Sequence, residues 1–163
     1  MPLVSATFQG ELIGIFEVGP GGNPSGKLVG MDISKAYMNY ISAGMNAGGF
    51  PFSAMPGVSA LGSALGDILD KESPSGALTA QKMAKEFDSC LQTFLSVNQT
   101  TIITTAGLPG LISELADLLG KENASATLFC QGFATAVNNH AMAAIVSGMI
   151  PGAPPIPFTG PIS

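Results

Sequence analysis

This 163-residue chain has few charged residues. Asp, Glu, Lys and Arg make up 10% of the sequence, every basic residue other than the single histidine is a lysine, and the net charge is −5. Without arginine and with a negative net charge, the chain is poorly suited to bind phosphate backbones. We therefore expect no nucleic-acid partner. So few charges also exclude an acidic disordered chain and a charged coiled coil.

Residues that carry chemistry are also scarce. Cys90, Cys130 and the single His140 make no C-x-x-C motif and no ligand spacing typical of a metal site. On one helix, Cys130 and His140 would be about 15 Å apart along the axis, too far for a nucleophile and its base. We expect two buried free thiols, a polar helix position at His140, and no metal, cofactor or enzymatic activity.

A glycine-rich segment near the N-terminus partly fits a phosphate-binding loop. Residues 21–27 read GGNPSGK, but Leu28 stands where such a loop needs Ser or Thr to hold magnesium. We interpret this segment as a flexible turn and expect no small-molecule substrate. The clustered acids alternate with lysines near expected helix ends, which is typical of solvated helix faces.

Neither a leader nor a membrane span is expected. Met1-Pro2-Leu3 has no basic or apolar signal region, which favours synthesis in the cytoplasm without a signal peptide. The apolar stretch 141–158 contains four prolines and so cannot run as one spanning helix.

Two long segments, 36–66 and 123–163, contain no Asp, Glu, Lys or Arg at all. Their surface could be made of Ser, Thr, Asn and Gly, but we expect them to face other protein subunits, because large uncharged surfaces usually mark contacts. The expected interface residues are Phe50, Phe52, Met55, Met149, Ile150, Ile156, Phe158 and Ile162.

Periodicity predicts a mainly α fold between two extended ends. Residues 1–30 are expected to form a β-like N-terminal arm and a glycine-rich turn, and residues 31–150 a helical body. The expected helices are 32–45, 58–69, 77–97, 111–119 and 124–148, with the β-like TTIITT at 100–105. Residues 151–163 are expected to form an extended proline-rich tail that orders only against a neighbouring subunit.

An internal repeat relates two parts of the body. SALGDILDKE at 63–72 and SELADLLGKE at 113–122 match at six of ten positions; a Pro-Gly pair precedes each and a longer expected helix follows each. This spacing predicts two related helical hairpins, with copies near 57–97 and 110–148, in one compact bundle of about five helices.

The arm at 3–18, the charge-poor hairpins, the TTIITT segment and the tail PGAPPIPFTG together resemble small virion proteins of tailed bacteriophages. The resemblance implies a non-enzymatic structural subunit of a virion, such as a tail, baseplate or capsid accessory protein. It would pack its arms and uncharged surfaces on copies of itself and on other subunits. The alternative is a small helical module that binds an apolar ligand or a membrane surface.

Overall fold

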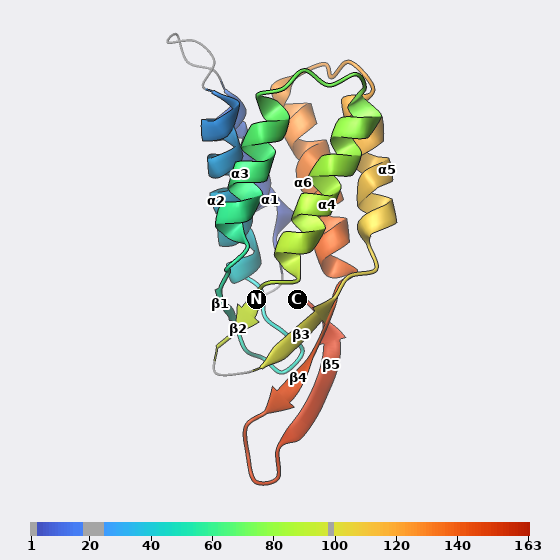
Figure 1. The fold of residues 1–163 in the computed structure, drawn as a ribbon. Coiled ribbons are helices and arrows are strands. Elements are labelled where there is room, and N and C mark those ends of the chain that lie inside the picture. The colour runs from blue at the N-terminus through green and yellow to red at the C-terminus, as the bar shows by residue number, and fades with distance from the viewer. Residues whose placement is uncertain (1–2, 18–24, 98–99) are drawn as a thin grey trace.

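The computed structural model describes residues 3–17, 25–97 and 100–163. Within them the chain forms six helices and five short strands (Figure 1). The helices are α1 (Ser5–Phe16), α2 (Gly26–Ser42), α3 (Val58–Leu69), α4 (Gly76–Leu91), α5 (Leu108–Leu119) and α6 (Ala126–Met142). The strands are β1 (Phe52–Ala54), β2 (Leu95–Ser96), β3 (Thr101–Thr104), β4 (Ile145–Ile150) and β5 (Ile156–Pro161). The prediction of a mainly helical fold is confirmed.

The helices come as three hairpins that repeat every fifty residues. The N-caps of α2, α4 and α6 are Ser25, Ser75 and Ser125, and each hydroxyl accepts a hydrogen bond from the backbone N–H three residues later, at 3.3, 3.2 and 3.2 Å. The first helix of every hairpin has 12 residues and the second has 17, 16 and 17. The described chain therefore has three hairpins and six helices, where the sequence predicted two and about five.

The first hairpin corrects the expected N-terminal arm. Residues 5–16 form α1 instead of strands, because Phe8 and Leu12, one helical turn apart, are both buried against the bundle. The glycine-rich turn at 21–27 lies mostly outside the described residues, and Gly26 and Lys27 already belong to α2.

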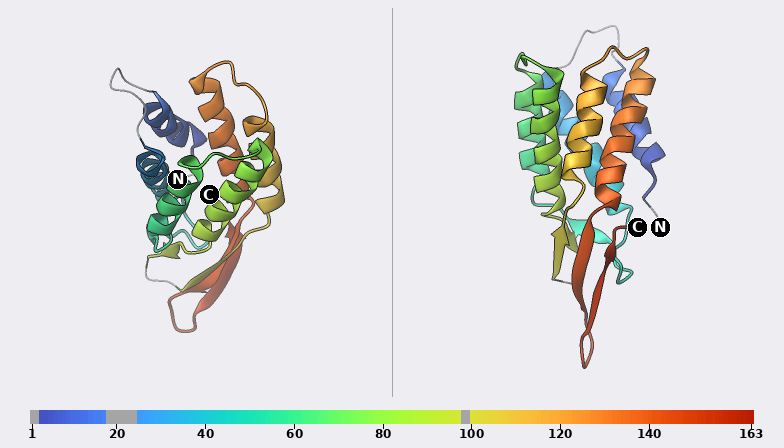
Figure 2. Two further views of the ribbon diagram at one scale, coloured as in Figure 1. Left: turned by 45° about the horizontal axis from the view of Figure 1, so that its top comes forward. Right: turned by 90° about the vertical axis from the view of Figure 1, so that its right-hand side faces the viewer.

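The six helices form a closed ring. Each helix contacts the next one along the chain, and α6 contacts α1 (Figures 1 and 2). The second helices line the inside: their positions at 33, 37 and 40, and the same positions fifty and one hundred residues later, are all buried. Aromatic rings fill much of this interior, including Tyr37 against Phe87 at 5.0 Å and Phe8 stacked on Tyr40 at 5.4 Å between ring centroids.

The repeats are equivalent in position more than in sequence. Both α3 and α5 begin after a glycine, Gly57 or Gly107, fifty residues apart. The two Pro-Gly pairs do not correspond, because Pro56-Gly57 precedes α3 whereas Pro109-Gly110 lies inside the first turn of α5.

All strands lie at one end of the helical ring (Figure 1). β1 pairs with β2, and β3, β4 and β5 form an antiparallel sheet in that order. The C-terminal segment is therefore not the unpaired extended tail that the sequence predicted. It runs back along β4 as β5, and Ile162 at its end is buried in the core of its own chain.

The C-terminal segment also closes the ring of repeats. In the second hairpin Ala54 pairs with Leu95, and in the third Thr104 pairs with Ile145, exactly one repeat later in both strands. One repeat earlier, the residue opposite Met45 would be Val4, but that place is taken by Ser163. Met45 and Ser163 exchange two backbone hydrogen bonds, of 2.7 and 3.0 Å. The chain's last strand thus supplies the strand that the first hairpin lacks.

Glycines set the distance between α2 and α3. A side chain at Gly30 would collide with the backbone nitrogen of Gly66 and lie 2.6 Å from the carbonyl oxygen of Gly62. The two helices therefore pack backbone against backbone, which makes this contact intolerant of added volume.

We predict that Gly30→Ala lowers the free energy of unfolding by about 1–3 kcal/mol, because the new methyl group forces α2 and α3 apart. Gly14→Ala in α1 is the matched control. A Cβ at Gly14 meets no atom within 4 Å, so this change should stabilise the protein by about 0.5–1 kcal/mol through helix propensity. Urea unfolding measures both; equal effects of the two changes would contradict the close contact.

Candidate functional site

One buried and one partly buried polar pair join neighbouring hairpins inside the ring. His140 Nε2 lies 2.8 Å from Asp88 Oδ1, and the other carboxylate oxygen of Asp88 accepts a hydrogen bond from Gln92 at 2.8 Å. The Tyr40 hydroxyl donates to Asn138 Oδ1 at 2.7 Å. These bonds connect the third hairpin to the second and the first hairpin to the third.

The two pairs occupy equivalent positions of the repeat. Tyr40 and His140 are one hundred residues apart, as are the positions of Met38 and Asn138, and Asp88 lies midway between the latter two. The third equivalent pair would be Cys90 and Met38, two sulfur-containing side chains. Replacing both members of a buried polar pair by apolar groups avoids an unsatisfied partner, whereas replacing one does not. This pattern indicates a structural role.

Asp88, Cys90 and His140 have the residue types of a nucleophilic triad but not its accessibility. Their exposed fractions are 8%, 3% and 1%. Burial raises the pKa of the Cys90 thiol from 9.0 to about 12, so at neutral pH it is not the thiolate that nucleophilic catalysis requires. The thiol of Cys130 is also buried, and burial, followed by the nearby charge of Glu17, raises its pKa. Both cysteines are free, as the sequence predicted.

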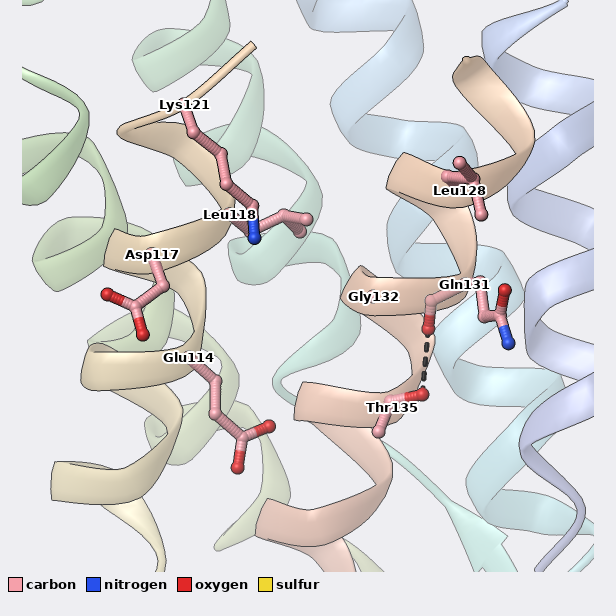
Figure 3. A pocket seen from close by; sticks show the side chains of 8 residues that line it. All are labelled: Glu114, Asp117, Leu118, Lys121, Leu128, Gln131, Gly132 and Thr135. Atoms are coloured by element: carbon pink, nitrogen blue, oxygen red, sulfur yellow. Dashed lines mark hydrogen bonds between the residues drawn. The ribbon is translucent and has the colours of Figure 1, made fainter. Parts of the chain in front are cut away.

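A groove lies between α5 and α6 (Figure 3). Its volume is about 470 Å³, and it is lined by Glu114, Asp117, Leu118, Lys121, Leu128, Gln131, Gly132 and Thr135. Figure 3 shows its carboxylates on the α5 side and the amide of Gln131 on α6, with the Thr135 hydroxyl bonded back to the carbonyl of Gln131 at 2.8 Å.

The same hollow recurs one repeat earlier, which argues against a dedicated ligand site. Between α3 and α4 a smaller groove of about 180 Å³ is lined in part by Asp67, Ile68 and Lys71, fifty residues before Asp117, Leu118 and Lys121. The grooves therefore follow from the shape of the hairpin.

The end of the molecule that carries the strands is the stronger candidate. Residues 43–57, 92–107 and 143–163 follow the second helices of the three hairpins, and they contain no Asp, Glu, Lys, Arg or His. In the described structure they come together at one end of the ring, which we call the uncharged strand end (Figures 1 and 2). The turns at the opposite end contain Asp70, Lys71, Glu72, Lys121 and Glu122.

One face of the three-stranded sheet is uncharged and carries exposed apolar side chains. Ile103 and Val146 are paired and buried, so the residues that alternate with them point outward. On that outer face Ile102 is 69% exposed, and Ile145 and Met149 are also exposed. The β4–β5 hairpin projects beyond the helices (Figure 2).

All eight residues expected at an interface lie in the uncharged strand end, but they differ in exposure. Met149 and Ile156 are exposed; Phe50, Met55, Ile150 and Phe158 are half-buried; Phe52 and Ile162 are buried in the core. Leu95, Ile102 and Ile145 are exposed at the same end and are absent from the expected set, although TTIITT indicates a β-branched strand without charge.

The described residues offer neither a group of His, Cys, Asp and Glu side chains that could hold a metal ion nor a helix long and apolar enough to cross a membrane. No protein-family model, no curated protein and no solved structure matches the chain.

We predict that neither cysteine reacts with a thiol reagent in the native protein at about pH 8, because both thiols are buried and protonated. Both should react once the chain is unfolded. Between pH 9.0 and about 12 the unfolded Cys90 releases a proton that the folded state keeps, so stability should fall as the pH rises through this range. Rapid labelling of one cysteine in the native state, measured by absorbance and mass spectrometry, would contradict this assignment.

Proposed function

We propose that the chain is a non-enzymatic structural subunit of a large protein assembly and that it contacts neighbouring subunits through the uncharged strand end. The observation that carries the proposal is the separation of charge. Every charged side chain lies outside this end, while Ile102 and Ile156 on it are 69% and 60% exposed. The resemblance to small virion proteins makes a bacteriophage particle the assembly that we propose.

The physical argument concerns the cost of removing water. Burying a charged side chain in an interface carries a desolvation penalty, whereas burying a side chain such as that of Ile102 contributes about 1.5–3 kcal/mol. A surface without charges therefore suits permanent contact with other protein surfaces. Copies of this chain each have a net charge of −5 and so repel one another. The uncharged strand end is the surface on which two copies would meet without like charges facing each other.

The alternative, a module that binds an apolar ligand or a membrane surface, has less support. The interior that a ligand would need is occupied by packed rings, such as Phe87 against Phe133 at 5.8 Å and Tyr37 against Phe94 at 5.9 Å between centroids.

We predict that Ile102→Lys weakens self-association at least tenfold, because it places a charge in the centre of the proposed contact face. Leu128→Lys is the matched control: it adds the same charge at a residue that is 53% exposed in the first turn of α6, away from the strands. Light scattering after size-exclusion chromatography, over a range of concentrations, measures both variants against the unmodified chain.

Two results would contradict the proposal. One is an unmodified chain that stays monomeric at every concentration reached. The other is a chain that associates equally well with and without Lys at position 102, which would move the contact to another surface.

A further inference from the structure

The C-terminal strand is held in a place that belongs, by the repeat, to the first hairpin. Ser163 lies opposite Met45, where the register of the other two hairpins would put Val4. We propose that residues 156–163 are exchanged between copies of this chain, so that β5 of one copy pairs with β4 and Met45 of a second copy. This inference rests on the proposed function and names the partner as a second copy and the contact as a swapped strand.

The site that receives β5 is shaped for this one segment. The ring of Phe158 lies over Gly148, its partner on β4, and against Gly48; a Cβ would come within 2.8 Å of the ring at Gly148 and 3.1 Å at Gly48. A Cβ on Gly160 would lie 2.6 Å from that of Ala47. Residues 48 and 148 are two repeats apart, so Phe158 spans the seam between the first and third hairpins. A strand from a second copy would fit this site unchanged, whereas an unrelated peptide would lose these contacts.

The connection between β4 and β5 suits an exchange. Residues 151–155, PGAPP, are all exposed and lie at the tip of the projecting hairpin (Figures 1 and 2). Proline-rich segments favour an extended chain. If the segment extends instead of turning back, β5 leaves its own copy, and the same side chains can then bind the equivalent site of a second copy. Swapping needs no new contact surface, because every interaction made within one copy is remade between two.

Charge does not oppose the exchange. Neither residues 143–163 nor the receiving segment 43–57 contains a charged side chain, so two copies can bring these ends together without an unpaired charge being buried. A different protein that binds through charged side chains would find no opposite charge on these segments. We therefore favour a second copy of this chain as the partner.

A pair of cysteines across β4 and β5 tests the exchange. Ser147 and Thr159 are directly opposite, and their hydroxyl oxygens are 3.1 Å apart, close enough for a disulfide between cysteines at these positions. The variant Ser147→Cys with Thr159→Cys is oxidised at low and at high concentration and analysed on a denaturing gel without reductant. We expect the associated fraction to run as covalently linked dimers or longer chains, and the monomeric fraction as single chains.

The two single variants are the controls, since each can only link identical positions and should give few dimers. Circular dichroism checks that the helices are intact. If the double variant associates by light scattering but runs entirely as single chains, the exchange is wrong while the proposed assembly role stands. If it does not associate at all, and neither does the unmodified chain, both are wrong.

Discussion

The seam between the first and third hairpins is the contact on which the rest of the structure depends. Three hairpins in a row would leave an open array with two uncovered faces, because each hairpin buries its apolar side only against its neighbours. The seam buries these two faces against each other. It consists of α1 on α6, the Tyr40–Asn138 hydrogen bond, Phe16 against Phe129 at 5.4 Å, and the bonds between Met45 and Ser163. Of these contacts, only the last is supplied by the C-terminal strand.

The repeat also explains why the two ends of the molecule differ so much. At one end the turns of the second and third hairpins, residues 70–75 and 120–125, are short, mostly exposed and charged, and a serine cap begins each second helix. At the other end the chain must pass from one hairpin to the next, and it does so through paired strands that need no charged side chain. A surface suited to protein contact therefore arises at the end where the hairpins are connected.

The sequence predicted where the later helices lie, because their apolar residues recur with a helical period. It was wrong about two of their ends: the expected helices 77–97 and 124–148 stop at Leu91 and Met142, and the chain continues into β2 and β4. It failed at α1, where many apolar and β-branched residues hide the one-turn spacing of Phe8 and Leu12. It missed the third repeat because equivalent positions share burial and capping but not residue type; Tyr40, Cys90 and His140 are one such set. Residue identity therefore does not reveal the third repeat, whereas the fifty-residue spacing of the N-cap serines Ser25, Ser75 and Ser125 does.

The candidate site could be predicted only in part, since the absence of charge was visible in the sequence but its collection at one end was not. The prediction of an extended tail is wrong, because prolines that exclude a helix or a central strand are still compatible with an edge strand. β5 is the edge strand of its sheet, and Pro157 and Pro161 have the same alternation as Ser163, whose N–H points away from β4 toward Met45. Their missing N–H groups therefore cost no bond to β4.

A circular permutant tests most directly whether β5 is the missing strand of the first hairpin. Leu3 and Ser163 both lie against Gly44, so a short Gly-Ser linker can join them. The chain is opened at Ala153, between Gly152 and Pro154. In this permutant β5 precedes α1, in the order that the other two hairpins have. Urea unfolding should give a cooperative transition and a free energy of unfolding within about 1 kcal/mol of the original chain. A permutant that fails to fold, or that loses several kcal/mol, would contradict the account.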